Sequence, residues 1–322
     1  MKAFIVKYIR QLVSIFEAVL ISKREYYQYQ SQLTNAVHDL VEEEAKHHDV
    51  GGIACIIFSK DRVIQLHSLL ETYEKFVSNP APIYVIYEAS SNEHELSYLE
   101  LSRILNKKSL DIKFIKEKKS FRKTLLELLS SIKTKKTFFL TDDNIFISNV
   151  DLSLLSRINP LKKILSLRHN PNINYSYTSN ENFNPPNFKP CKENNQLLEF
   201  NWFERESTWS DPWSVDGHIY STAEVLVLSK ISDYRFPNSY EASLKSFNFL
   251  MNDRKGVCFS KSVILNIPLN IVQNESDNLS GNVSTDYLLK CWNDGFKLDV
   301  SFLEDHPVKS THEIQSLSFV KR

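Results

Sequence analysis

Two adjacent carboxylates and an amide follow an apolar, aromatic run near the middle of the chain. Residues 137–140 contain no Gly, Pro or charge, which is typical of a strand buried on both faces. Asp142, Asp143 and Asn144 come directly after Thr141. Adjacent carboxylates repel each other and lose hydration at a buried strand end, so a positive charge normally offsets them. The pattern predicts either a site for a hard cation shared with a phosphate, or a solvated acidic turn.

The elements around this group alternate regularly. Apolar runs at residues 53–58, 83–87, 111–115 and 137–140 indicate strands, and helical spacing occupies the segments between them. The order β-α-β-α-β-α-β over residues 52–144 predicts a parallel sheet with right-handed crossovers, hence an α/β fold. Ligands of such sheets lie outside the carboxyl ends of the strands, which is where the acidic pair falls.

The second half of the sequence is less regular. Residues 163–167 indicate a strand that ends at Arg168, residues 170–198 a long loop, and residues 222–231 a helix. Aromatic rings beside carboxylates and amides are typical of a sugar-binding surface. They are equally compatible with core and turn residues, and both interpretations remain open for Trp209, Trp213 and His218.

Composition excludes several classes of function. The 39 basic and 39 acidic residues give zero net charge, which disfavours a nucleic-acid partner. Six glycines leave no room for a Gly-rich phosphate loop, so an anionic ligand needs a metal or Arg and Lys side chains. The four cysteines form no C-x-x-C pair, which argues against a cysteine zinc site and is typical of a reduced, cytosolic protein.

The N-terminal segment is amphipathic. Apolar residues recur at helical spacing over residues 1–32, and Lys7, Arg10 and Glu17 interrupt them, which argues against a transmembrane span. No small-residue cleavage site follows, which argues against a signal peptide. Two interpretations remain: a helix packed on the domain or on a second subunit of a homo-oligomer, or a basic helix on an anionic membrane surface. Residues 40–49 are predicted to be a polar helix end and linker.

An ordered set of short motifs over residues 52–315 resembles GT-A-fold glycosyltransferases, and more closely bacterial, family-2-like enzymes of surface polysaccharide synthesis such as O-antigen and capsule. Each motif is weak alone, and their order makes the resemblance specific. The motifs are Phe58-Ser59-Lys60-Asp61-Arg62, Thr141-Asp142-Asp143-Asn144-Ile145-Phe146, Ser166-Leu167-Arg168 with Asn172, Ser214-Val215-Asp216-Gly217-His218-Ile219-Tyr220, Pro237-Asn238-Ser239-Tyr240-Glu241, Asn266-Ile267-Pro268-Leu269-Asn270-Ile271-Val272-Gln273 and Ser310-Thr311-His312-Glu313.

The resemblance implies one GT-A unit over residues 51–322, with a mostly parallel central sheet and an N-terminal helical extension over residues 1–50. Residues 51–150 would be the Rossmann-like half that binds a nucleotide-sugar donor. Residues 151–322 would bind a glycan or lipid-linked saccharide acceptor. The implied location is cytoplasmic, with peripheral contact to the inner face of the plasma membrane if residues 1–32 bind lipid.

The resemblance also implies roles for individual residues. The metal, Mn²⁺ or Mg²⁺, would be held by Asp142, Asp143, Asn144 and His312. Many relatives have a third Asp where this chain has Asn144, so either Asp143 takes that role, the amide oxygen coordinates, or metal dependence is weak. The nucleotide sugar would contact Ser59, Lys60, Asp61, Arg62, Asp142 and Arg168, and the acceptor would contact Trp209, Trp213 and His218.

An inverting transferase needs a carboxylate as general base, and Glu241 is the first candidate, with Asp216 second. Glu241 could instead stabilise the dipole of the helix it opens, and a retaining reaction would need neither. Two other functions stay open. One is a catalytically weak glycan-binding or scaffold protein, which Asn144 favours. The other is a nucleotidyltransferase, which normally has a Gly-rich loop that residues 59–62 lack.

Overall fold

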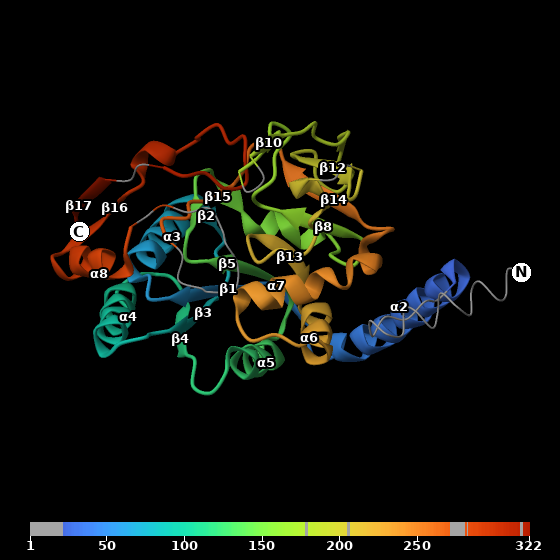
Figure 1. Ribbon diagram of the computed structural model, residues 1–322, viewed down its shortest axis with the longest axis horizontal. Coiled ribbons are helices and arrows are strands. Elements are labelled where there is room, and N and C mark those ends of the chain that lie inside the picture. Colours follow the sequence, from blue (N-terminus) through green and yellow to red (C-terminus); the bar gives the residue numbers. More distant parts are fainter. Residues whose placement is uncertain (1–21, 178–179, 205–206, 271–280, 282, 316–317) are drawn as a thin grey trace, which may run out of the picture.

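Apolar runs in the first half of the sequence form the parallel core of a nine-stranded mixed sheet (Figure 1). The computed structural model describes residues 22–177, 180–204, 207–270, 281, 283–315 and 318–322. Four neighbouring strands are parallel because each connection crosses over through a helix. In spatial order they are β5 (Thr134–Thr141), β1 (Val50–Lys60), β3 (Ile83–Glu88) and β4 (Ile112–Lys116).

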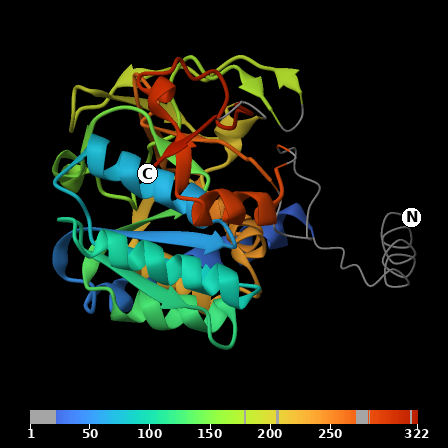
Figure 2. The same ribbon diagram turned by 90° about the vertical axis from the view of Figure 1, so that its left-hand side faces the viewer.

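Helices cover both faces of this core. Figure 2 views the face covered by α3 (Val63–Phe76), α4 (Asn92–Leu105) and α8 (Thr285–Asn293). On the other face α5 (Phe121–Ser131) packs against α6 (Thr222–Ile231). The chain runs from β1 outward to β4 and returns to β5 on the other side of β1. The strand order therefore reverses between β1 and β5, the point where α/β sheets bind ligands at their carboxyl ends.

The second half of the chain extends the same sheet. β13 (His218–Ser221) lies antiparallel between β5 and β8, and β8 is parallel to β14. The expected α/β fold with a parallel core is confirmed, and the sheet is mixed beyond β5. The added strands are β8 (Lys163–Ser166), β14 (Lys255–Phe259), β12 (Leu197–Asn201) and β11 (Lys189–Pro190). The sequence predicted β8, whereas β14, β12 and β11 had no sequence signal strong enough to predict them.

Smaller elements complete the fold. A two-stranded sheet brings Asn266 opposite Asn144, and an isolated bridge joins Asn266 to His312. The other elements are β2 (Val77–Ser78), β6 (Asn144–Phe146), β7 (Val150–Asp151), β9 (Tyr175–Ser176), β10 (Glu181–Asn182), β15 (Ile264–Asn266), β16 (Phe296–Asp299), β17 (Ser318–Lys321), α7 (Pro237–Lys245), η1 (Leu152–Arg157), η2 (Thr208–Ser210), η3 (Asn248–Met251) and η4 (Ser301–Leu303).

The N-terminal helix in the described part is α2 (Lys23–Ala45), which begins at a capping box formed by Ser22 and Glu25. The expected helix end and linker over residues 40–49 are confirmed, since α2 ends at Ala45 and a turn leads to β1. The buried Val37 and Val41 lie where α2 packs against α6. Residues 1–21 of the helix predicted over residues 1–32, and residues 271–273 of the matched motifs, lie outside the described residues. The rest of that helix is the start of α2. Within the described part, no helix combines the length and apolarity needed to cross a membrane.

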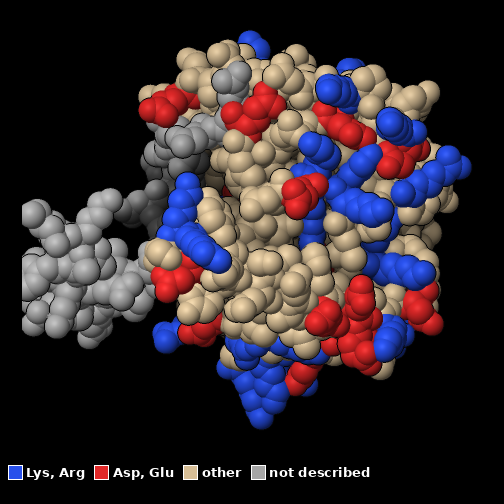
Figure 3. Space-filling view, turned by 90° about the vertical axis from the view of Figure 1, so that its right-hand side faces the viewer, with Lys and Arg blue, Asp and Glu red and all other residues tan. Residues whose placement is uncertain are grey.

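Charge and cysteine usage agree with the sequence. Basic and acidic side chains lie interspersed on the face shown in Figure 3, as the balanced composition suggests. All four cysteines are buried and unbridged, which confirms them as reduced core residues. A buried ion pair joins α6 to the segment before β14, where the Arg254 guanidinium donates to both Glu224 oxygens at 2.8 and 2.6 Å.

Gly217, directly before β13, lets the chain pack closely against the neighbouring segments. Because β13 runs antiparallel to β5, its start lies at the edge where β5 ends. Gly217 has a φ of +74°, and a Cβ there would lie 2.4 Å from Ile264 Cδ1. Its N–H donates to the Phe139 carbonyl at 2.8 Å, and its own carbonyl accepts the Leu167 N–H at 2.9 Å. Only glycine fits both the dihedral and the space.

We predict that Gly217→Ala lowers the free energy of unfolding by roughly 1–3 kcal/mol, because it adds a left-handed strain and a steric clash. Chemical denaturation of both forms measures the difference. Gly51→Ala is the matched control, since no atom lies within 4 Å of a Cβ at that position. Equal loss of stability in the two variants would contradict the role of Gly217.

Candidate active site

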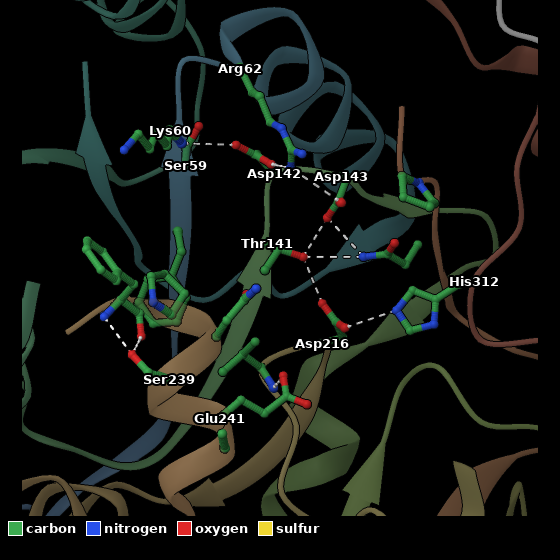
Figure 4. A pocket seen from close by; sticks show the side chains of 18 of the residues that line it. Ser59, Lys60, Arg62, Thr141, Asp142, Asp143, Asp216, Ser239, Glu241 and His312 are labelled. Atoms are coloured by element: carbon green, nitrogen blue, oxygen red, sulfur yellow. Dashed lines mark hydrogen bonds and ion pairs between the residues drawn. The ribbon is translucent and has the colours of Figure 1, made fainter. Parts of the chain in front are cut away.

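A cavity of about 990 Å³ opens at the carboxyl ends of β1 and β5. The parallel register places Phe58 beside Thr141, so the segments that follow these two strands meet. The start of β13, the end of β8, the start of α7 and the segment around His312 close the other sides. Figure 4 shows the labelled side chains pointing into this space from those elements. It lies where the sequence predicted a ligand site.

Arg62 neutralises the acidic pair. Its Nη1 donates to Asp142 Oδ1 at 3.0 Å and lies 3.5 Å from Asp143 Oδ2, and its Nη2 donates to the Asn270 carbonyl. The second Asp142 oxygen accepts the Lys60 N–H at 3.3 Å. Both oxygens of Asp142 are therefore engaged within the protein. Asp143, whose side chain is 11% exposed, keeps Oδ2 turned toward the cavity and Arg62.

Burial dominates the titration of Asp142. It raises the pKa of this carboxyl to about 6, and the neighbouring charge of Asp143 adds to the rise while Arg62 opposes it. Desolvation disfavours a carboxylate, and a guanidinium at hydrogen-bond distance favours it. Arg62 is thus the cation that opposes the effect of burial on Asp142.

Asn144 is a structural residue and not a metal ligand. It is fully buried, its Oδ1 accepts the Thr141 N–H at 3.1 Å, and its Nδ2 donates to Asp216 Oδ1 at 3.2 Å. The expectation that its amide oxygen coordinates a cation is wrong, because that oxygen closes the turn after β5. Asn266 takes up a position that sequence reasoning missed, with Nδ2 at 2.9 Å from Asp143 Oδ1.

Asp216 is a fixed anion. Arg168 Nη1 donates to its Oδ2 at 3.1 Å, and Thr141 Oγ1 lies 2.8 Å from its Oδ1. Burial alone would raise the pKa of Asp216, but the charges of Arg168 and His312, with hydrogen bonds from Thr141 and Asn144, hold it below its usual value. An ionised carboxylate stabilised in this way is a weak base.

The pKa of Glu241 is shifted in the opposite direction to that of Asp216. It faces the cavity from the middle of α7, beyond the first turn, and its Oε2 accepts the Val215 N–H at 3.4 Å. Burial raises its pKa to about 7, and the charges of Asp211 and Asp216 add to this while Lys245 lowers it. Two carboxylates of one cavity whose pKa values move apart are the pattern of separate roles in acid–base chemistry.

His312 also faces the cavity. Its Nδ1 lies 3.1 Å from Thr311 Oγ1, and its Nε2 lies 3.8 Å from Asp216 Oδ2. Burial and then the charge of Arg168 lower the pKa of His312 below its usual value. The lowered pKa favours the neutral imidazole, which is the form that binds metals.

Residues 59–62, at the end of β1 and directly after it, differ in whether they line the cavity. Ser59, Lys60 and Arg62 line the cavity as predicted. Asp61 does not line it, and the expected contact with a nucleotide is wrong for this residue in the described structure. Its carboxylate accepts the Ser90 N–H at 2.8 Å, and its φ of 54° shapes the turn into α3.

The aromatic residues chosen for the acceptor are core residues. Trp209, Trp213 and His218 are fully buried, and the indole of Trp209 donates to the Ile173 carbonyl at 3.2 Å. The expected acceptor contact is wrong for all three, because none of them lines the cavity and each packs against another ring in the interior. The exposed ring at this cavity is Phe236, 41% exposed, which carried no sequence signal.

Among the residues that the structure describes, metal-ligating side chains do not form a closed cage at this cavity. Within the described part of the chain, the trio of His, Cys, Asp or Glu whose ligand atoms lie within 4.8 Å of one another is Cys191, Glu193 and Glu199. Lys163 Nζ lies 2.5 Å from both glutamates of that trio. At the cavity, Asp143 offers a hard oxygen and His312 a neutral nitrogen. This set fits a Mg²⁺ or Mn²⁺ ion that takes its other ligands from phosphates and water.

Comparison with known proteins gives one distant relative. No family model matches the chain. Over 192 residues it is 27% identical to the bifunctional glycosyltransferase pgtA of Dictyostelium discoideum. The match covers 54% of this chain and 24% of the relative, so the chain spans about a quarter of that protein's length.

Three solved structures show partial likeness. TarS 1–349 of S. aureus with UDP-GlcNAc has a TM-score of 0.42 at 16% identity, over 72% of this chain and 62% of that one. The 4-diphosphocytidyl-2C-methyl-D-erythritol synthase of Anaerococcus prevotii has a TM-score of 0.40 at 11% identity, over 77% and 99%. The mannosyltransferase PcManGT of Pyrobaculum calidifontis with GDP-Man and Mn²⁺ has a TM-score of 0.29 at 11% identity, over 43% and 44%. Scores at this level carry no conclusion about this chain.

We predict that Arg62→Met destabilises the protein by about 3–5 kcal/mol at pH 8, because it leaves the buried carboxylate of Asp142 and the neighbouring Asp143 without their cation. Adding Asp142→Asn to this variant should restore part of the loss. Lys75→Met is the control, since the Lys75–Glu304 pair is half exposed and should change stability by less than about 1 kcal/mol. Denaturant titration gives all the values, and no recovery in the double variant would contradict the pairing.

Proposed function

We propose that this protein is a glycosyltransferase that moves a sugar from a nucleotide-sugar donor to an acceptor hydroxyl. One observation carries the proposal. The acidic pair with Arg62 lies at the switch point of the sheet, and Glu241, with a pKa of about 7, lines the same cavity. The local identity to a bifunctional glycosyltransferase supports it.

Two arginines suit an anionic donor. The Nε atoms of Arg62 and Arg168 are buried and have no hydrogen-bond partner among the described residues, and both side chains line the cavity. A buried donor without an acceptor is costly, and a phosphate oxygen would satisfy it. We infer that the diphosphate of the donor lies between these two arginines, with Ser59 and Lys60 beside the nucleoside.

Asp143 and His312 are the residues that would hold a divalent cation, Mn²⁺ or Mg²⁺. Bound there, the cation would stabilise the negative charge of the departing diphosphate. Asp142 acts differently, since Arg62 and the Lys60 N–H occupy its two oxygens. We propose that Asp142 keeps Arg62 in place, so that the guanidinium presents its free Nε to the donor.

Glu241 is the proposed general base. A carboxylate with a pKa of about 7 is partly ionised at neutral pH and can accept the proton of an acceptor hydroxyl as that hydroxyl attacks the sugar. Asp216 remains ionised beside Arg168 and serves as a fixed charge. A base in this position implies an inverting reaction.

The acceptor and the setting rest on the sequence resemblance. We propose a glycan or lipid-linked saccharide of bacterial surface polysaccharide synthesis, such as O-antigen or capsule, made at the cytoplasmic face of the membrane. Phe236 is the exposed ring that a sugar could contact at this cavity. Contact of residues 1–32 with anionic lipid is supported only by the basic residues Lys2, Lys7 and Arg10 among apolar ones.

The alternative of an inactive scaffold loses its main support. It rested on Asn144 as a missing metal ligand, whereas Asn144 is buried and closes the turn after β5. Asp143 and His312 both line the cavity without it.

We predict that one nucleotide among UDP, GDP, CMP and dTDP raises the melting temperature, and that Mn²⁺ increases the rise, since ligand binding to the native state stabilises it. Asp143→Ala should lose the Mn²⁺-dependent part and reduce turnover by about 10²-fold or more. Asp253→Ala, at an exposed position, is the control. No response to any nucleotide, with or without Mn²⁺, would favour the scaffold protein.

We predict that kcat/KM rises about tenfold per pH unit up to about pH 7 and is constant above it, because only ionised Glu241 accepts a proton. Glu241→Gln should lose at least about 10²-fold in rate and the break in the profile. Asp211→Asn should move the break to lower pH and Lys245→Met to higher pH, because these charges raise and lower the pKa of Glu241. Unmoved breaks in both variants would assign the base elsewhere.

The same pKa has a consequence for stability. The folded protein holds the Glu241 proton more tightly than the unfolded chain, where the pKa is 4.5. The contribution of Glu241 is therefore complete below pH 4.5 and is lost as the pH rises toward about 7. Glu241→Gln should remove this loss from the stability profile, which denaturation at several pH values measures.

A further inference from the structure

One residue of β15 contacts both segments that carry the proposed cation ligands. Asn266 is the last residue of β15, lines the cavity and is only 5% exposed. Its side chain contacts the carboxylate of Asp143, and its main chain pairs with His312. The donor and acceptor contacts proposed above give Asn266 no role.

The two oxygens of the Asp143 carboxylate are engaged unequally. Two donors lie within hydrogen-bond distance of Oδ1, namely Asn266 Nδ2 at 2.9 Å and Thr141 Oγ1 at 2.7 Å. Oδ2 lies 3.5 Å from Arg62 Nη1, which is longer than a normal hydrogen bond. Bonds to Oδ1 fix the plane of the carboxylate, so Oδ2 is the oxygen left for a cation.

Of the two donors to Asp143, the Thr141 hydroxyl is shared. Its Oγ1 also lies 2.8 Å from Asp216 Oδ1. A hydroxyl has one proton, so it donates to only one of these two carboxylates at a time. The amide of Asn266 lies closer to Asp143, at 2.9 Å, than to Thr141 Oγ1, at 3.4 Å. Asn266 is therefore the donor that Asp143 keeps whichever way the Thr141 hydroxyl points.

The main chain of Asn266 holds the segment around His312. Its N–H donates to the Thr311 carbonyl at 3.4 Å, and its carbonyl accepts the Glu313 N–H at 3.1 Å. The residues on both sides of His312 are thus bound to Asn266. Thr311 Oγ1 lies 3.1 Å from His312 Nδ1, which leaves Nε2 directed at Asp216, 3.8 Å from its Oδ2 (Figure 4).

Main-chain bonds hold Asp143 in place independently of the Asn266 side chain. The Ile267 N–H donates to the Asp143 carbonyl at 2.8 Å, and the register of β15 and β6 places Asn266 opposite Asn144. Replacing the amide should therefore keep both main chains where they are and release only the Asp143 carboxylate. The effect on a bound cation can then be separated from an effect on folding.

We propose that Asn266 is a positioning residue for the cation: its amide turns Asp143 Oδ2 into the cavity, and its main chain sets the place of His312. This role rests on the cation site of the proposed function. A carboxylate held in one orientation loses less freedom when it binds an ion than a freely rotating one. Removing the hydrogen-bond partner of a metal ligand typically weakens metal binding by about 10–100-fold.

Electron paramagnetic resonance tests the proposal, because free Mn²⁺ gives a sharp signal that is lost on binding. Mn²⁺ is titrated into the full-length protein alone and with UDP, GDP, CMP or dTDP. The native chain should bind one Mn²⁺ ion. Asn266→Leu, which has a similar volume and no donor, should weaken binding by about 10–100-fold while near-ultraviolet circular dichroism stays unchanged.

Asn187→Leu is the matched control. The Asn187 amide also donates to a carboxylate, Glu204 Oε1 at 2.6 Å, but it is exposed and does not line the cavity. Its substitution should leave the Mn²⁺ affinity at the native value. If Asn266→Leu does not fold, Asn266→Ser replaces it, since a serine keeps a polar side chain that is too short to reach Asp143 and should also weaken Mn²⁺ binding.

Native Mn²⁺ affinity in a folded Asn266 variant overturns the proposal, and so does an equal loss in Asn187→Leu. A native chain that binds a nucleotide but no Mn²⁺ also overturns it, and leaves a metal-independent transferase standing. Mn²⁺ binding that Asn266→Leu weakens, without binding of any nucleotide, supports the role of Asn266 and contradicts the transferase. The two proposals therefore fail on different results.

Discussion

The site depends on the contact between one guanidinium and two adjacent carboxylates. Asp142 is buried at the end of β5 and the side chain of Asp143 is 11% exposed, so water stabilises their charge poorly there. Arg62 supplies the counter-charge from the neighbouring strand end, at 3.0 and 3.5 Å. This contact requires β1 and β5 to lie side by side, and it joins the two segments that bound the ligand cavity.

Tertiary packing also separates the carboxylates by function. Asp216 and Glu241 line one cavity, yet their pKa values differ. Arg168 and two hydrogen bonds lower the pKa of Asp216, whereas burial raises the pKa of Glu241 to about 7. The difference comes from the partners of each group and not from residue type. Gly217 makes the arrangement possible, because its left-handed backbone lets Asp216 enter the cavity while β13 joins the sheet.

The N-terminal helix α2 is anchored to the domain by one face. Val37 and Val41 are buried where α2 packs against α6, whereas Tyr26, Tyr29, Leu33 and Leu40 are exposed.

Sequence alone determined the parallel core, because continuous apolar runs alternating with helical spacing allow few arrangements. It also determined the place of the acidic pair at the ligand edge, and Arg62 and Glu241 as residues of that site. It failed for Trp209, Trp213, His218, Asp61 and Asn144, whose residue types suit both a ligand contact and the interior. Only the tertiary structure decided between these, since burial and hydrogen-bond partners arise from segments far apart in the chain. The same holds for Asn266 and Phe236, which reach the cavity through the pairing of β15 with β6 and the start of α7. Local sequence patterns carry no signal for such long-range contacts.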